Sequence, residues 1–511
     1  MNFVRRVFPL LCLCLMATVA TFSATFTVTK VADTNDGVCD ADCSFREAVA
    51  AANAAAGDDI IVFSSLFNTP QTIVLSGTEI IIGSNGALTI IGPGANLLTL
   101  DGNQASRILV TGANVNATIE GIRFTRGNGV GATNTGRGGA IYNVGGTLTI
   151  RNSILTNNTA ANGGAINNAA SASPNPVVNA DLTIFNCIIS NNSSTSSGGA
   201  MQNFSTSTFR LYSSTVSGNT SATGGGGAMQ ANGSVIIANS TFAGNTSQGT
   251  TGGGAIVTNG SLFNMTNSTV SGNTSATNGG GIHRSTTNVN GFIRNSIIAG
   301  NTGPSPDVSN SANGLQSQGN NIIGAVGTST GWVGSDLLNT TPMLGTLGDN
   351  GGFGQTFVPQ PGSPAINGGQ NCVLDASCSA NNLPINLTTD QRGISRPQGT
   401  SVDIGAVEVA ASASNVSVGG RVFASNGQAV RGAIVTISTP PTLGTPVIQS
   451  VTTNNFGYFT FTGIPSGASY QLNVFAKGLE FNAVTIQVSS DINDLVLTAT
   501  NNNLSGKDGH R

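Results

Sequence analysis

Residues 226–252 read GGAMQANGSVIIANSTFAGNTSQGTTG, and the next 26 residues, 253–278, read GGAIVTNGSLFNMTNSTVSGNTSATN. The two lines share a Gly-Gly-Ala start, a central apolar run, an Asn-Ser-Thr triplet and a final Gly-Asn-Thr-Ser. Such self-similarity is the signature of a repeat fold. The Gly-Gly motif opens six copies, with spacings of 25 to 35 residues, at Gly138, Gly163, Gly198, Gly226, Gly253 and Gly279.

Each copy contains short β-branched runs, separated by Gly and Asn residues that accept a positive φ, and lacks a helical 3.6-residue period. Because so small a unit cannot bury its own apolar face, successive copies must stack, with equivalent strands about 4.8 Å apart in parallel ladders. The Leu-x-x-Leu-x-Leu spacing of leucine-rich repeats is absent, and a propeller blade needs about 40 residues. The sequence therefore predicts an all-β chain whose centre, residues 60–345, is a right-handed parallel β-helix.

One column of the repeats holds asparagine, and we expect these amides to stack into a ladder at one turn. The next position is serine in most copies and cysteine at Cys187, and the two-residue strand period places it inside the coil. Cys187 is therefore interpreted as a small buried thiol rather than a nucleophile. The expected ladder consists of Asn152, Asn186, Asn239, Asn267 and Asn295.

The first 24 residues have the pattern of a secretory signal peptide, with Arg5 and Arg6 before an apolar run at 7–20 and small residues after it. That run is shorter than the ~20 residues of a membrane-spanning helix, and no second one follows. The mature chain is thus expected to be secreted or on the outer cell surface, with no transmembrane segment. In an oxidising compartment, two close pairs should form disulfides, Cys39 with Cys43 and Cys372 with Cys378.

Composition limits the partners. Charged residues make up 8% of the 511 residues and the net charge is −3, so no basic patch is available for nucleic acid. The regularly spaced apolar residues argue against disorder.

The N-terminal flank, residues 25–59, is expected to be a helical cap over the open strand edges of the β-helix. Ser44-Phe45-Arg46-Glu47 is a capping box, and an alanine-rich stretch follows it. The motif Cys39-Asp40-Ala41-Asp42-Cys43-Ser44-Phe45-Arg46-Glu47-Ala48 resembles the signature of bacterial CSLREA-domain proteins, with Phe45 in place of the usual leucine.

Residues 346–410 resemble the choice-of-anchor Q domain, through the stretches GSPAIN at 362–367, TDQRG at 389–393 and DIGAVE at 403–408. The resemblance implies a position C-terminal to β-helix repeats on a surface protein. The family's members carry varied sorting tails, and the polar tail 501–511 matches none of them, so the sequence does not predict the anchor. Four charged residues here are interpreted as salt bridges and turn caps, with a catalytic acid cluster as the alternative: Asp390, Arg392, Asp403 and Glu408.

Residues 415–500 alternate as short strands with hairpin signals such as Asn426-Gly427. They resemble the carboxypeptidase regulatory-like domain, which implies a small β-sandwich with a transthyretin-like or carbohydrate-binding-like fold. A peptidase is not expected, because His283 and His510 are the only histidines and no zinc-ligand constellation is present.

The favoured function is a non-catalytic secreted or cell-surface protein, adhesin-like or a spacer, which contacts a glycan or a cell-surface component through the sandwich. The repeats also resemble those of bacterial polymorphic outer-membrane proteins. The alternative is a polysaccharide lyase or glycoside hydrolase, because pectate-lyase-like enzymes share the fold. Glycoside hydrolysis needs two carboxylates, yet residues 121–300 contain one, Asp181, and leave Asp101 and Glu120 as the best acidic pair.

No cofactor is expected, with Ca²⁺ as the one alternative. Oxygen ligands at alternating positions suit this ion, but their spacing departs from the EF-hand pattern by one residue, and a turn held by the adjacent disulfide is favoured. The candidate ligands are Asp33, Asn35, Asp36, Asp40 and Asp42.

Overall fold

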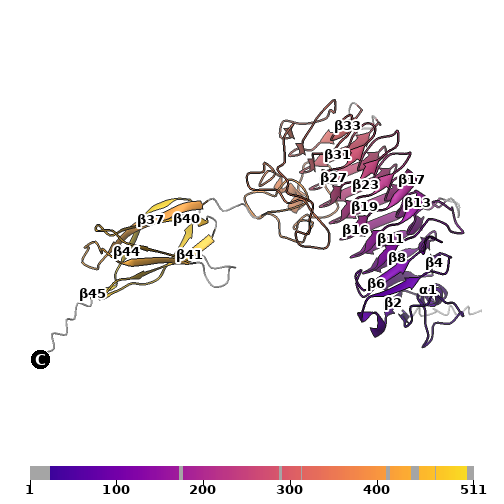
Figure 1. Ribbon diagram of the computed structural model, residues 1–511, viewed down its shortest axis with the longest axis horizontal. Helices are drawn as coiled ribbons and strands as arrows, with labels where there is room; N and C mark the ends of the chain where they lie inside the picture. Colours follow the sequence, from indigo (N-terminus) through magenta and orange to yellow (C-terminus); the bar gives the residue numbers. More distant parts are fainter. Residues whose placement is uncertain are drawn as a thin grey trace, which may run out of the picture. The chain divides into compact units, whose positions relative to one another are not determined.

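The structure is a computed structural model that describes residues 23–83, 85–171, 177–286, 290–311, 314–409, 415–438, 448–465, 468–488 and 490–502. The chain divides into two compact units, residues 1–409 and 410–511 (Figure 1). Nearly all of the predicted signal peptide, residues 410–414 before the predicted sandwich, and most of the polar tail lie outside the described residues.

The first unit is a parallel β-solenoid of about nine turns, in which each coil contributes one strand to each of several parallel sheets. Figure 1 shows these strands stacked from β2 to β33. Sheet 1 contains β1 (Thr25–Val28), β2 (Asp59–Phe63), β5 (Ala87–Ile91), β8 (Asn116–Glu120), β11 (Thr147–Arg151), β15 (Asp181–Phe185), β19 (Thr208–Tyr212), β23 (Ser234–Ala238), β27 (Leu262–Thr266), β31 (Gly291–Arg294) and β34 (Gln316–Ser317).

Sheet 2 follows sheet 1 in each coil. It contains β3 (Gln71–Val74), β6 (Leu98–Asp101), β9 (Arg123–Thr125), β12 (Ile154–Thr156), β16 (Ile188–Ser190), β20 (Thr215–Ser217), β24 (Thr241–Ala243), β28 (Thr269–Ser271), β32 (Ile297–Ile298), β35 (Ile322–Ile323) and β36 (Leu337–Leu338).

Two further sheets complete the coils. Sheet 3 contains β13 (Thr159–Asn162), β17 (Ser193–Ser197), β21 (Thr220–Ser221), β25 (Thr246–Ser247) and β29 (Thr274–Ser275). Sheet 4 contains β4 (Ile80–Ile82), β7 (Leu109–Thr111), β10 (Ile141–Val144), β14 (Ile166–Ala169), β18 (Met201–Asn203), β22 (Met229–Ala231), β26 (Ile256–Thr258), β30 (Ile282–Arg284) and β33 (Val308–Asn310).

The core lies inside the coils, where the strand alternation of the repeats stacks equivalent apolar side chains. In sheet 1, Ile150 aligns with Ile184 and Leu211 in successive coils, and all three are fully buried. Complete burial of such a side chain stabilises the fold by about 1.5–3 kcal/mol. The predicted all-β fold, with a parallel solenoid and a C-terminal sandwich, is confirmed.

The turn between sheets 1 and 2 explains the predicted asparagine column, which we call the outer column. Its residues adopt a positive φ of 44° to 53°, a conformation in which asparagine is enriched among non-glycine residues. Asn152, Asn186, Asn239, Asn267 and Asn295 occupy it, and Ser213 holds the same place in one repeat with a φ of 48°.

A second asparagine column, the inner column, was not predicted. It follows sheet 2 in each coil and is buried, and each Nδ2 donates to the Oδ1 of the next member at 2.8–3.0 Å. The chain of amides ends on a carboxylate. Its members are Asn158, Asn192, Asn219, Asn245, Asn273 and Asn301, with Asp307 at the end.

The serine column also faces the interior. The Cys187 amide donates to Ser214 Oγ at 3.0 Å, and the Ser214 amide donates to Ser240 Oγ at 3.2 Å. Each coil is thereby tied to the next by a hydrogen bond inside the turn. Cys187 is buried, and burial raises the pKa of its thiol to about 12.

At the N-terminal end, the solenoid starts earlier than the predicted residue 60. Strand β1 comes from the segment predicted to be a separate cap, and it pairs in parallel with β2. Helix α1 (Phe45–Ala54) begins at Ser44 with the predicted capping box, and its Phe45 and Val49 join the solenoid core. Figure 1 shows α1 beside β2 and β4. Its role as an edge cover stays a prediction. The short 3₁₀ helix η1 (Ser65–Asn68) follows β2.

The second unit is a small β-sandwich. One sheet has the order β40-β37-β44 and the other β39-β38-β41-β43, with a β42-β45 pair beside them. Val418, Val435, Phe461 and Leu472 are among its buried core residues. The strands are β37 (Asn415–Phe423), β38 (Ile434–Ser438), β39 (Ile448–Thr452), β40 (Tyr458–Pro465), β41 (Ala468–Phe475), β42 (Leu479–Glu480), β43 (Val484–Val488), β44 (Ile492–Thr498) and β45 (Asn501–Asn502).

Candidate functional site

Residues 346–409, here called the flank segment, belong to the solenoid unit and lie against sheet 2. Threonines on sheet 2 bind this segment. Gln391 is buried between two of them: its Nε2 donates to Thr215 Oγ1 at 2.8 Å, and Thr241 Oγ1 donates to its Oε1 at 2.6 Å. The Ala406 amide donates to Thr269 Oγ1 at 3.1 Å.

A signal for this contact was present in the repeats. The position after the serine or cysteine is Thr215, Thr241 and Thr269 in three successive copies, but it is Ile154, Ile188 and Ile297 in the others. A hydroxyl in an otherwise apolar column marks the three coils whose outer surface is covered by polar chain.

The outer column contacts the flank segment as well. Nδ2 of Asn239 donates to Thr389 O at 2.6 Å, that of Asn267 to Asp403 O at 3.0 Å, and that of Asn295 to Gln370 O at 3.1 Å. Within the predicted ladder, two direct bonds are present, Asn186 to Asn152 at 2.6 Å and Asn295 to Asn267 at 3.2 Å. The outer column is therefore not the continuous ladder that we predicted, because three of its five asparagines donate to backbone carbonyls of the flank segment and Asn152 donates to Glu120.

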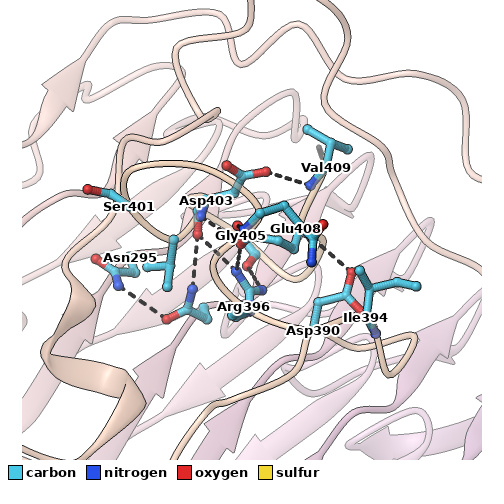
Figure 2. A network of polar contacts seen from close by, with 12 residues as sticks. Asn295, Asp390, Ile394, Arg396, Ser401, Asp403, Gly405, Glu408 and Val409 are labelled. Carbon is cyan, nitrogen blue, oxygen red and sulfur yellow. Dashed lines mark hydrogen bonds and ion pairs between the residues drawn. The ribbon is translucent and has the colours of Figure 1, made fainter. Parts of the chain in front are cut away.

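Figure 2 shows the charged network at the centre of the flank segment. Arg396 and Glu408 are fully buried and form an ion pair, with Nη1 to Oε2 at 2.7 Å. The other guanidinium nitrogen, Nη2, donates to Gly405 O at 2.8 Å and to Asn239 Oδ1 at 3.3 Å. The two Glu408 oxygens accept the amides of Gln398 and Asp403, each at 2.8 Å.

The two aspartates of this network are bonded just as fully. Asp390 accepts the amides of Arg392, Ile394 and Glu408 at 2.8–3.0 Å and pairs with the Arg392 guanidinium at 2.8 Å. Asp403 accepts the amides of Asn367 and Val409, both at 2.7 Å. Burial raises the pKa of Asp403 to about 6. These carboxylates cap turns and close the segment on itself, so they are not placed as catalytic acids.

A disulfide and apolar contacts hold the same segment. Cys372 and Cys378 are bridged beside the 3₁₀ helix η2 (Asn371–Leu374), and Val373 and Leu387 pack with Tyr212 of β19. The second predicted disulfide, Cys39 with Cys43, is also present, so both pairings are confirmed.

Two surface depressions lie along the flank segment, the first at the turn between sheets 1 and 2 and the second on sheet 2. One, of about 440 Å³, is lined by Phe185, Asn186, Phe353, Asp390 and Arg392, among others. The other, of about 420 Å³, is lined by polar and apolar residues of three coils, such as Ile188, Thr215 and Ala243, and by Leu347 and Gln355 of the flank segment. Among the described residues that line them, the only carboxylate is Asp390, which is bonded to Arg392 and to the Glu408 amide, so neither groove contains a pair of acids.

The structure does not bring the predicted acidic pair together. Asp101 ends β6 in sheet 2 and is held by Arg126, with Nη2 to Oδ2 at 2.6 Å. Glu120 ends β8 in sheet 1 and accepts a hydrogen bond from Asn152 Nδ2 at 2.7 Å. The two carboxylates therefore end strands of different sheets, and each is bonded to another side chain.

The predicted Ca²⁺ ligands also have other partners. Asp33 binds the Arg46 guanidinium at 2.8 Å and the Ser76 amide at 2.7 Å, and Asp42 pairs with Lys30 at 3.0 Å. Asp36 and Asp40 each cap a turn, by accepting the amide two residues on. Among the described residues, the Asn35 side chain forms no hydrogen bond that would place it beside these aspartates. The part of the chain that the structure describes contains no group of three His, Cys, Asp or Glu residues placed to hold a metal ion.

The sandwich has its own surface features. A depression of about 550 Å³ is lined by Ile434, Phe475, Lys477 and Glu480, among others. On the β40-β37-β44 sheet, Phe456 and Tyr458 are exposed beside Arg421.

The geometry defines a protein of two modules, a parallel β-solenoid with a polar flank segment and a small β-sandwich. In sequence, residues 417–500 match the carboxypeptidase regulatory-like domain, which confirms that resemblance. No curated protein matches the chain. Among the described residues, no helix is both long and apolar enough to span a membrane.

Proposed function

We propose that this protein is a non-catalytic adhesin-like or spacer protein of the outer cell surface. A β-solenoid with a carboxypeptidase regulatory-like domain fits a surface or structural protein. In this proposal the solenoid acts as a rigid stalk and the sandwich binds a glycan or another cell-surface component. The observation that carries the non-catalytic part is the bonding of the candidate acids: Asp101, Asp390, Asp403 and Glu408 are each held by arginine or by backbone amides.

Secretion is part of the proposal. It is supported by the signal-peptide pattern of residues 1–24 and by two disulfides, which persist in oxidising compartments. We also propose that residues 25–59 and the flank segment are CSLREA-type and choice-of-anchor Q-type modules, on the motifs quoted above. N-terminal sequencing of the extracellular protein tests the proposed secretion, with residue 25 as the expected first residue. An intact N-terminus in the cytoplasmic fraction would contradict it.

The alternative is a polysaccharide lyase or hydrolase acting in one of the flank grooves. The grooves have volumes of about 420 and 440 Å³, but among the described residues their lining lacks a pair of facing acids.

One experiment separates the two functions. The full-length secreted protein is screened on a glycan array, and the same glycans are incubated with it in a reducing-end assay, with and without a chelator. Binding without release of reducing ends is the expected result. Turnover above the level of a heat-denatured control would overturn the non-catalytic proposal.

A further inference from the structure

The outer face of sheet β40-β37-β44 gathers aromatic side chains around one arginine. The strand alternation directs Val418 and Val422 into the core and Arg421 and Phe423 outward. In register with Arg421 lie Tyr458 on β40 and Val496 on β44. Tyr458 is 50% exposed, Val496 63% and the adjacent Phe456 67%, so the row faces solvent within this unit.

Arg421 is held in place without an acidic partner. Its guanidinium carbon lies 4.6 Å from the centre of the Tyr458 ring and 4.9 Å from that of Phe423, and its Nε donates to Phe456 O at 2.8 Å. Among the described residues no carboxylate lies within ion-pair distance of it. Asp494 is exposed on β44 beside Gly419, in the row next to that of Arg421, and forms no ion pair with Arg421. Among the described residues, the N–H groups of its two terminal nitrogens, Nη1 and Nη2, therefore donate to no acceptor.

We propose that this aromatic-arginine face binds an acidic polysaccharide through its uronate residues. The inference deepens the proposed function, because it rests on the sandwich being the glycan-binding module and names the surface and the glycan class. The uronate carboxylate accepts hydrogen bonds from the two Nη atoms of Arg421, and the C–H face of a pyranose ring packs on Tyr458 or Phe456.

The choice of ligand follows from charge and shape. A guanidinium with a free fork pairs best with a planar carboxylate, and its fixed orientation reduces the entropy lost on binding. The flanking rings offer flat apolar surface beside that charge, which suits a sugar that carries its carboxylate on the ring.

The test uses the full-length protein and two matched ligands, oligogalacturonate and its methyl ester. They share the same rings, but only the first carries charge. We expect binding of oligogalacturonate in calorimetry, weaker binding at high salt, and at least about a tenfold loss for the methyl ester. Arg421→Gln and Tyr458→Ala should each weaken the binding by a similar factor. Arg431→Gln is the control, because it removes the same charge from an exposed position of the same unit that has no ring contact.

The outcomes are distinct. Oligogalacturonate binding that Arg421→Gln leaves unchanged, with thermal unfolding also unchanged, overturns the inference but leaves the proposed function in place. Binding that Arg431→Gln weakens equally overturns the inference in favour of general charge attraction. Failure to bind any glycan, acidic or neutral, overturns the glycan-binding part of the proposed function too. A concentration-dependent dimer that Arg421→Gln abolishes would assign the face to a second copy of the chain.

Discussion

The two asparagine columns of the solenoid use one residue type at one repeat period, and they differ in what surrounds the side chain. In the inner column, Asn219 accepts from the amide and Nδ2 of Asn192 and donates to Asn245 Oδ1 and Ile189 O, all in the dry interior. In the outer column, the partner changes from coil to coil. Asn186 bonds its neighbour Asn152, whereas Asn267 bonds the flank segment.

The difference shows that a column in the sequence is not necessarily a ladder in space. Asparagine occurs in the outer column because its backbone accepts a positive φ, and its side-chain amide binds whichever chain segment covers the turn. Asparagine occurs in the inner column because its side-chain amide bonds backbone groups that every coil leaves in the interior. In the inner column the residue just before the asparagine takes the positive φ instead, as at Asn157 and Gly218.

The end of the inner column supports this view. Along the column each Nδ2 donates to the member in the next coil, so the last donor, Asn301 Nδ2, donates to the carboxylate of Asp307 at 2.8 Å. A charged acceptor at that end strengthens a row of aligned hydrogen bonds. The other Asp307 oxygen accepts the Ala325 amide at 2.6 Å, so the column is joined to the chain after the last full coils.

The largest loss of folding stability is expected for Asn219→Ala, in the middle of the inner column. The substitution leaves the Asn192 amide without its acceptor and removes the Asn219 donor from Ile189 O, and Asn192 Nδ2 keeps only its bond to Leu155 O at 3.0 Å. We expect a loss of stability on the order of 3–6 kcal/mol, because each buried orphan costs about 1–3 kcal/mol. Chemical denaturation of the full-length protein measures it. A loss below that of Asn267→Gly would contradict the distinction between the columns.

The second effect is a pH dependence confined to the flank segment that the outer column holds. Burial raises the pKa of Asp403 from 3.8 to about 6, so the folded state binds this proton more tightly than the unfolded state. Its contribution to stability is complete below about pH 4 and is lost as the pH rises through 6, by on the order of 3 kcal/mol.

Hydrogen exchange of residues 389–409, corrected for intrinsic rates, tests this between pH 4 and 7. Protection should fall with rising pH, and Asp403→Asn should remove the slope. The inner-column amides from Asn158 to Asn273 do not titrate and serve as the internal control. Protection of the flank segment that increases with pH would contradict the prediction.

A smaller loss of stability is expected for Asn267→Gly, an outer residue under the flank segment where glycine accepts the φ of 44°. The change removes the donor to Asp403 O and the acceptor of Asn295 Nδ2, which keeps its bond to Gln370 O. We expect a loss of about 1–2 kcal/mol, seen chiefly as faster exchange in the flank segment. Unchanged exchange there would show that the outer column does not hold the segment.

The smallest effects are expected for Asn186→Gly and Cys187→Ser, next to each other in one coil. Glycine accepts the φ of 53° at position 186, so only one partly exposed bond is lost, at no more than about 0.5 kcal/mol.

At position 187, Sγ lies 3.3 Å from Phe185 O, the carbonyl equivalent to those that accept from the serine hydroxyls at 2.6–2.9 Å in other coils. A hydroxyl there has an acceptor, so Cys187→Ser should cost less than about 1 kcal/mol. Rapid maleimide labelling of native Cys187 would contradict its buried position.

Local and periodic information in the sequence was sufficient for much of this protein. The Gly-Gly repeats determined a stacked parallel solenoid, because a unit too small to fold alone has to bury its apolar residues against its neighbours. The alternation of β-branched residues determined which of them face inward, and the capping box of Ser44 and Glu47 and the two short disulfides needed only residues close in the chain.

Only the tertiary structure decided the roles of the polar residues. Asn158 and Asn152 both read as turn residues in the sequence, and the bend of the coil alone determines which amide points inward. Gln391 lies 176 residues from Thr215, and Asp403 lies 136 residues from Asn267, so no local pattern contains these pairs. Hydrogen bonds and ion pairs depend on where two separated segments meet, whereas burial of an apolar residue depends mainly on which way its own strand faces.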